Sequence, residues 1–105
     1  MYIINTSFMI EPIVHGQWYE FITKKFIPYL KSVGYKDIVF TKVLSENIEK
    51  HHTYSMQIHL ESIPEYQKYV NEIFDEYISV AKPIFGANVV YVNTLMKKVQ
   101  YEEVE

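Results

Sequence analysis

A few polar side chains interrupt otherwise apolar segments, and their types could support chemistry. A neutral histidine can act as a general base or ligate a metal, and nearby amide and hydroxyl groups can orient its ring. Alternate residues of an extended chain point to the same side, which can gather such groups on one face. We assign no catalytic residue. The candidate ligand-binding residues are His59, Gln57, Asn5, Ser7, Asn93 and Tyr91.

The sequence leaves two interpretations of these residues open. They can form a binding site, or they can satisfy one another and ordered water at a subunit interface. No acidic residue can be placed as the third member beside Ser7 and His59, so no catalytic triad is predicted. No Asp or Glu lies inside an apolar strand, so a glycosidase-like carboxylate pair is not predicted either.

The other histidines are predicted to lie at the surface. His51 and His52 are adjacent, and adjacent residues of an extended chain point to opposite sides, which disfavours joint metal binding. His15 falls in the first turn of a predicted helix. The chain has no cysteine, which excludes disulfides, thiolate nucleophiles and cysteine-ligated metals. We therefore expect no metal and no cofactor.

Four strands carry the candidate residues. Strands are predicted at residues 2–10, 38–44, 53–60 and 88–98. The first and third alternate apolar with polar residues, and the fourth is rich in β-branched residues and apolar on both sides. The polar segment 45–52 is expected to be a surface turn between the second strand and the third.

Two long helical patterns separate these strands, because apolar residues recur there at steps of three and four. Gly34 and Gly86 are expected to end the helices in a left-handed conformation. A capping box at Ser62 starts the second helix. Pro28 is expected to kink the first helix near residues 25–27, and Pro83 to bend the last turn of the second.

The element order is therefore β-α-β-β-α-β within 105 residues. Right-handed crossovers turn this order into an α+β, ferredoxin-like fold, with a four-stranded antiparallel sheet and both helices on one face. We expect one domain over residues 1–100, followed by an acidic tail over residues 101–105.

One face of such a sheet has no helix over it. If the helices cover Ile4 and Phe8, the open face has a polar middle and apolar ends, which suits a second copy of the sheet packed against it. A homodimer enclosing a polar cavity, a dimeric α/β barrel, is therefore predicted. In the second strand the outward residues remain ambiguous, either Lys42 with Phe40 or Thr41 with Val39 and Val43.

Charge and hydropathy limit the partners. The net charge is −3 with no block of Lys or Arg, which argues against nucleic acid. No apolar run approaches the roughly 20 residues that span a bilayer, and the first residues lack the pattern of a signal peptide. We expect a soluble cytoplasmic protein without membrane contact.

Several short stretches resemble a known family. They are Asn5–Phe8, Trp18, Ile27–Pro28, Lys42–Leu44 and Tyr54–Gln57. With these stretches the chain resembles the bacterial DUF4286 family over nearly its whole length. The segment from Lys25 to Gly34 also resembles the end of the first helix in the dimeric α/β-barrel superfamily.

The resemblance implies a ferredoxin-like dimer, and the superfamily includes cofactor-free monooxygenases, haem-degrading enzymes and dye-type peroxidases. Many relatives have a histidine before the Ile-Pro pair, where this chain has Phe26. Two functions are carried forward. One is a homodimeric domain that binds a small ligand or a protein partner between its sheets. The alternative is a cofactor-independent monooxygenase acting on an aromatic molecule through His59 and its neighbours.

Overall fold

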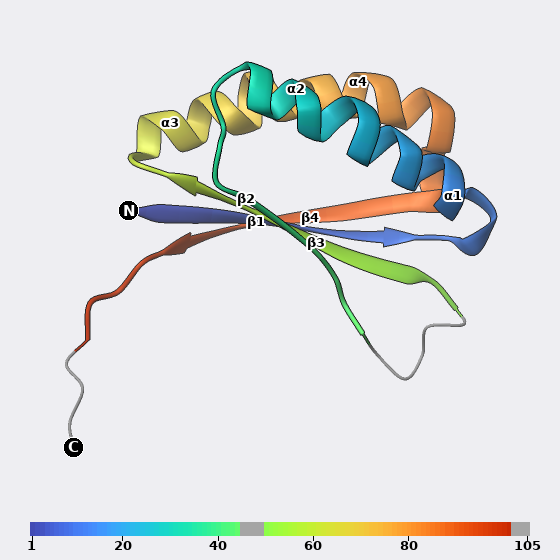
Figure 1. Cartoon of the computed structure of the whole chain (residues 1–105), viewed down its shortest axis with the longest axis horizontal. Helices are drawn as coiled ribbons and strands as arrows, with labels where there is room; N and C mark the ends of the chain where they lie inside the picture. The colour runs from blue at the N-terminus through green and yellow to red at the C-terminus, as the bar shows by residue number, and fades with distance from the viewer. Residues whose placement is uncertain (45–49, 102–105) are drawn as a thin grey trace.

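The computed structural model describes residues 1–44 and 50–101, and in it two helical rods lie over one face of a four-stranded sheet (Figure 1). The strands are β1 (Tyr2–Ile10), β2 (Ile38–Lys42), β3 (His52–Leu60) and β4 (Val89–Lys97). Their order in the sheet is β2-β3-β1-β4, and every neighbouring pair is antiparallel. The predicted turn at 45–52 and the tail at 101–105 fall largely outside the described residues.

The first rod consists of α1 (Pro12–Phe21), a π-helical turn (Ile22–Phe26) and α2 (Ile27–Ser32). The π-helical turn directly precedes Pro28, which lies in the first turn of α2 and removes one backbone donor. The irregularity therefore lies where a kink is predicted. Gly34 follows α2 with a φ of 107°, a conformation that favours glycine.

The second rod consists of α3 (Ile63–Lys68), a π-helical turn (Tyr69–Ile73) and α4 (Phe74–Phe85). Ser62 caps it, since its hydroxyl accepts from the Glu65 amide at 3.3 Å. The Glu65 carboxylate reaches back to the amide of Glu61, at 2.8 Å. The irregular turn here has no proline and is not predicted by the sequence. Gly86 ends α4 with a positive φ, as expected.

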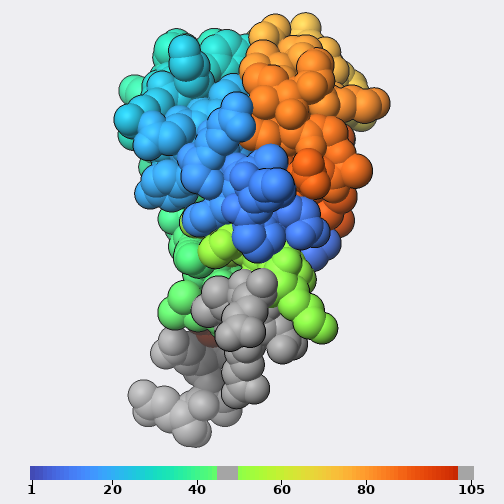
Figure 2. Space-filling view, turned by 90° about the vertical axis from the view of Figure 1, so that its right-hand side faces the viewer, coloured from blue at the N-terminus to red at the C-terminus, as the bar shows by residue number. Residues whose placement is uncertain are grey.

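The core lies between the rods and the sheet. Alternate residues of β1 and β3 point into it, which confirms the predicted facing of both strands. Phe8 contacts the rings of Trp18 and Tyr77, which come from the two rods. Figure 2 shows the rods side by side above the end of the sheet. No helix of residues 1–44 and 50–101 lies on the other side of the sheet (Figure 1).

Candidate functional site

The middle of the open sheet face carries a strip of polar side chains, which we call the polar strip. It consists of Asn5, Ser7, Ser55 and Gln57. In the register of β1 with β3, Asn5 lies opposite Gln57 and Ser7 opposite Ser55. Residues opposite each other in an antiparallel pair share a face, so all four point away from the helices.

Two hydrogen bonds hold the polar strip in one arrangement. The Asn5 side-chain amide donates to the Ser7 hydroxyl at 3.1 Å, and the Ser55 hydroxyl donates to the Asn5 side-chain oxygen. The amide of Asn5 is thus fixed between two hydroxyl groups. Ser55 is not among the predicted site residues, although its alternation with Gln57 on β3 is the signal that places it there.

Apolar side chains lie on both sides of the polar strip on the same face, together with Thr94 opposite Asn5 and Thr41 opposite Ser55. On the β4 side they are Val90, Val92 and Met96, with Met9 from β1 opposite Val90. Val92 is 58% exposed and Val90 is 45% exposed. On the other side Val39 lies opposite Gln57. Exposed apolar side chains gathered on a sheet face without a helix over it favour contact with another surface.

The outward residues of β2 are settled by its register. Val39 lies opposite Gln57 and Thr41 opposite Ser55, so both belong to the open face. Phe40 faces the helices, and its ring stacks on that of Tyr54. The second of the two predicted alternatives is therefore the observed one.

His59 lies on the open face at one end of the polar strip. It lies opposite Ile3 of β1, one row beyond the pair of Asn5 and Gln57. It also borders a shallow surface depression with Lys36 and Asp37. No hydrogen bond joins the His59 ring to another described residue. The ring is therefore a neighbour of the polar strip, not its centre.

The predicted placement of Asn93 and Tyr91 beside these residues is wrong. In the register of β4 with β1, Asn93 lies opposite Thr6 and Tyr91 opposite Phe8, so both point toward the helices. The hydroxyl of the fully buried Thr6 donates to the Asn93 side-chain oxygen. The Tyr91 ring packs edge-on against Phe74, with ring centroids 5.0 Å apart. Asn93 is polar, but its side-chain oxygen is satisfied by Thr6 on the helix side of the sheet, so it does not mark the open face.

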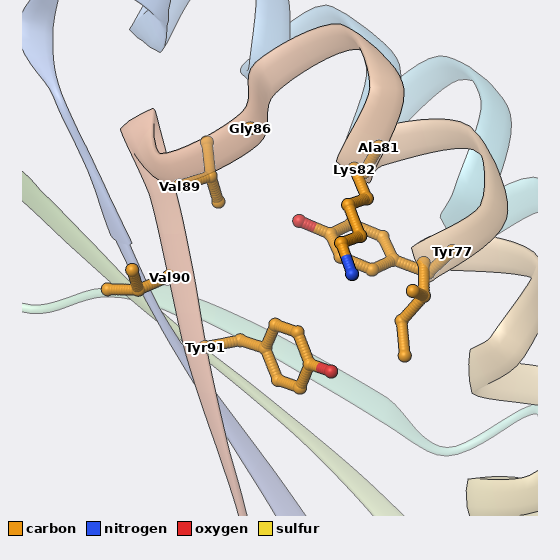
Figure 3. A pocket seen from close by; sticks show the side chains of 8 residues that line it. Tyr77, Ala81, Lys82, Gly86, Val89, Val90 and Tyr91 are labelled. Carbon is orange, nitrogen blue, oxygen red and sulfur yellow. The ribbon is translucent and has the colours of Figure 1, made fainter.

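A separate hollow lies between α4 and the edge strand β4, and we call it the α4–β4 chamber (Figure 3). Its volume is about 320 Å³. Side chains from both elements extend into it, among them the amino group of Lys82 and the ring of Tyr91 (Figure 3). It is lined by Tyr77, Ile78, Ala81, Lys82, Gly86, Val89, Val90 and Tyr91. The sequence does not signal this space, because it arises from the separation of two elements.

The hydroxyl of Tyr77, a residue that lines the chamber, accepts a hydrogen bond in the core. The indole nitrogen of Trp18 donates to it at 3.0 Å, and both side chains are almost fully buried. Burial raises the pKa of Tyr77 to about 12, so the phenol keeps its proton near neutral pH. Because its oxygen already accepts from Trp18, the hydroxyl proton remains available to an acceptor.

A histidine pair lies at the end of the sheet opposite to His59, contrary to the prediction of two surface positions. The rings of His15 and His52 stack with centroids 3.7 Å apart and an angle of 11° between their planes. A ring nitrogen of His15 lies 2.7 Å from the Tyr54 hydroxyl. Partial burial, together with nearby positive charge, lowers the pKa of both histidines. His52 is also the first residue of β3, not part of a loop.

Neither a metal cluster nor a membrane-spanning helix is found in residues 1–44 and 50–101. Within those ranges no group of three or more histidine or acidic residues is arranged to hold a metal ion. None of the helices there is long and apolar enough to cross a bilayer.

Comparison of the sequence with known protein families assigns the chain to one of them. Residues 1–99 match the model of a family described as "Domain of unknown function (DUF4286)". The chain belongs to the DUF4286 family. The predicted resemblance is thus confirmed. No curated protein matches the chain.

Solved structures show the same fold at low sequence identity. An ethyl tert-butyl ether d (ethd) family protein from Bacillus halodurans C-125 has a TM-score of 0.65 and 11% identity, covering 94% of this chain and 100% of its own. A dimeric ferredoxin-like protein from an uncultured marine organism has a TM-score of 0.57 and 20% identity, covering 97% of this chain and 99% of its own. A second protein so described, also from an uncultured marine organism, has a TM-score of 0.56 and 10% identity, covering 96% and 97%. The ferredoxin-like fold predicted for this DUF4286 protein is therefore confirmed.

Proposed function

We propose that this DUF4286 protein is a homodimeric binding domain whose open sheet faces pair and enclose the polar strips of both copies. The observation that carries the proposal is the composition of the open face, where exposed apolar side chains border an internally hydrogen-bonded polar centre. In a two-fold dimer the same surface of each copy meets its counterpart, so the polar strips face each other. Two structural neighbours are described as dimeric, which supports a dimer.

We further propose that the paired faces enclose a small polar ligand. Asn5 is already held by Ser7 and Ser55, so it presents a fixed amide, whereas Gln57 makes no side-chain hydrogen bond to another described residue. A carboxamide carries both donors and acceptors. Gln57 and the Ser7 hydroxyl are therefore the groups with which a ligand would exchange hydrogen bonds.

Sedimentation velocity of a charge variant tests the pairing. Val92 is 58% exposed in the apolar border, and Val92→Lys would bring two ammonium groups into the interface. We expect wild type to sediment as a dimer and this variant as a monomer with an unchanged circular dichroism spectrum. Ile13→Lys is the matched control, because Ile13 is 86% exposed but lies on α1, away from the open face. If both variants remain dimeric, the open face is not the interface.

Native mass spectrometry tests the enclosed ligand. A dimer that carries extra mass, lost in a Gln57→Leu variant, supports binding at the polar strip. A dimer whose mass equals that of two chains, even after incubation with cell extract, argues that the polar strip only joins the two sheets.

An enzyme has less support. The monooxygenase hypothesis relied on His59 acting with neighbouring polar groups, but Asn93 and Tyr91 lie on the helix side of the sheet. If a turnover is detected, His59→Ala decides its role, since unchanged turnover would remove His59 from the chemistry.

A further inference from the structure

The α4–β4 chamber is a second feature, which lies between the helices and the sheet and shares Val90 with the border of the open face. We propose that it binds a small monocarboxylic acid with an apolar body, the carboxylate at Lys82 and the body against the aliphatic wall and the ring of Tyr91. The proposal rests on the lining of the chamber and is independent of dimerisation.

The size of the chamber fits a molecule of this kind. Its volume of about 320 Å³ is at the lower end of the range for ligand pockets. About ten water molecules occupy this volume in liquid water. A ligand of about ten non-hydrogen atoms therefore fills it.

The walls favour an apolar body. Ile78, Ala81 and Val89 contribute aliphatic surface, and the rings of Tyr77 and Tyr91 are nearly perpendicular to each other, with centroids 6.3 Å apart. Transfer of apolar surface from water to such walls is favourable.

The polar groups favour an anion at one end. Lys82 is the only charged residue that lines the chamber, and no carboxylate of residues 1–44 or 50–101 forms an ion pair with it. The Tyr77 hydroxyl adds a donor, since its oxygen is occupied by Trp18 and its proton is free. One ammonium group and one phenol match the acceptors of a single carboxylate.

Pairs of ligands that share an apolar body but end in a carboxylate or in an alcohol test this assignment. Isotope-labelled full-length protein is titrated with octanoate and octanol, and with phenylpropionate and phenylpropanol, while amide chemical shifts are followed. We expect shifts at residues 77–91 and about tenfold tighter binding of each acid than of its alcohol. Lys82→Gln should remove that preference, whereas Lys31→Gln, an exposed lysine on α2, should preserve it.

Two results would overturn the proposal. Equal affinity for acid and alcohol, unchanged in Lys82→Gln, would mean that the chamber does not select a carboxylate. An absence of shifts at residues 77–91 with all four compounds at millimolar concentration would mean that the chamber is not a binding site for this class. Lys82 is exposed, so the variant is expected to fold, and its amide spectrum verifies this.

Discussion

The hydrogen bond between Trp18 and Tyr77 joins the two helical rods inside the core, and Tyr77→Phe removes its acceptor. The indole N–H of Trp18 is completely buried, and the Tyr77 hydroxyl is its one acceptor among the described residues, at 3.0 Å. The phenylalanine ring retains the contacts with Phe8 and Phe74. The variant therefore isolates the loss of one buried hydrogen bond.

The expected cost follows from the donor that is left without a partner. An unsatisfied buried donor costs about 1–3 kcal/mol, and we expect Tyr77→Phe to lower the free energy of unfolding by about 2 kcal/mol. For a domain of this size about 1 kcal/mol lowers the melting temperature by about 4–8 °C. A decrease of about 10 °C is therefore expected.

Tryptophan fluorescence during urea unfolding measures this loss directly, because Trp18 is the only tryptophan of the chain. Protein concentration is kept constant between variants, since the proposed dimerisation would contribute to apparent stability. Tyr19→Phe is the matched control, because Tyr19 is 43% exposed and its hydroxyl can bind water. Equal unfolding midpoints for Tyr77→Phe and Tyr19→Phe would refute the structural role of this hydrogen bond.

Two further predictions concern stability. Gly16→Ala should raise the free energy of unfolding by about 0.5–1 kcal/mol in urea titrations, because the site is exposed within α1 and an added Cβ contacts nothing there; an unchanged midpoint would contradict this. Because burial lowers the pKa of His15 and His52, the unfolded chain binds more protons than the folded chain below the usual histidine pKa of about 6.5. The urea concentration at the unfolding midpoint should therefore decrease as the pH is lowered from about 7.5 to about 5, and it should decrease less in His52→Gln than in wild type. An equal decrease in both proteins would exclude His52 as a source of the pH dependence.

The sequence predicts the fold well because β1 and β3 alternate strictly. Ile4 and Phe8 are buried while Asn5 and Ser7 lie on the open face, so period-two patterning decided which side the helices cover. Helix ends were also predictable, since Gly34 and Gly86 adopt the positive φ that glycine permits. These features depend on local patterns that the order of residues contains.

The parts that could not be predicted depend on tertiary contacts. The strand β4 is apolar on both sides, so only register with β1 shows that Asn93 faces the core, where Thr6 satisfies it. The stacking of His15 on His52 joins residues that are far apart in sequence and whose types usually indicate a surface. The α4–β4 chamber likewise depends on how a helix and a strand diverge, which no spacing of residues encodes.

The pairing of open sheet faces is tested most directly by magnetisation transfer between two copies of the chain. Of the four methionines, Met9 and Met96 lie on the open face and Met56 is buried under the helices. A mixed dimer is prepared from one copy with labelled methionine methyl groups and one unlabelled copy. We expect intermolecular nuclear Overhauser effects at the Met9 and Met96 methyl groups and none at Met56. A monomer, or contacts between copies that do not include Met9 and Met96, would contradict it.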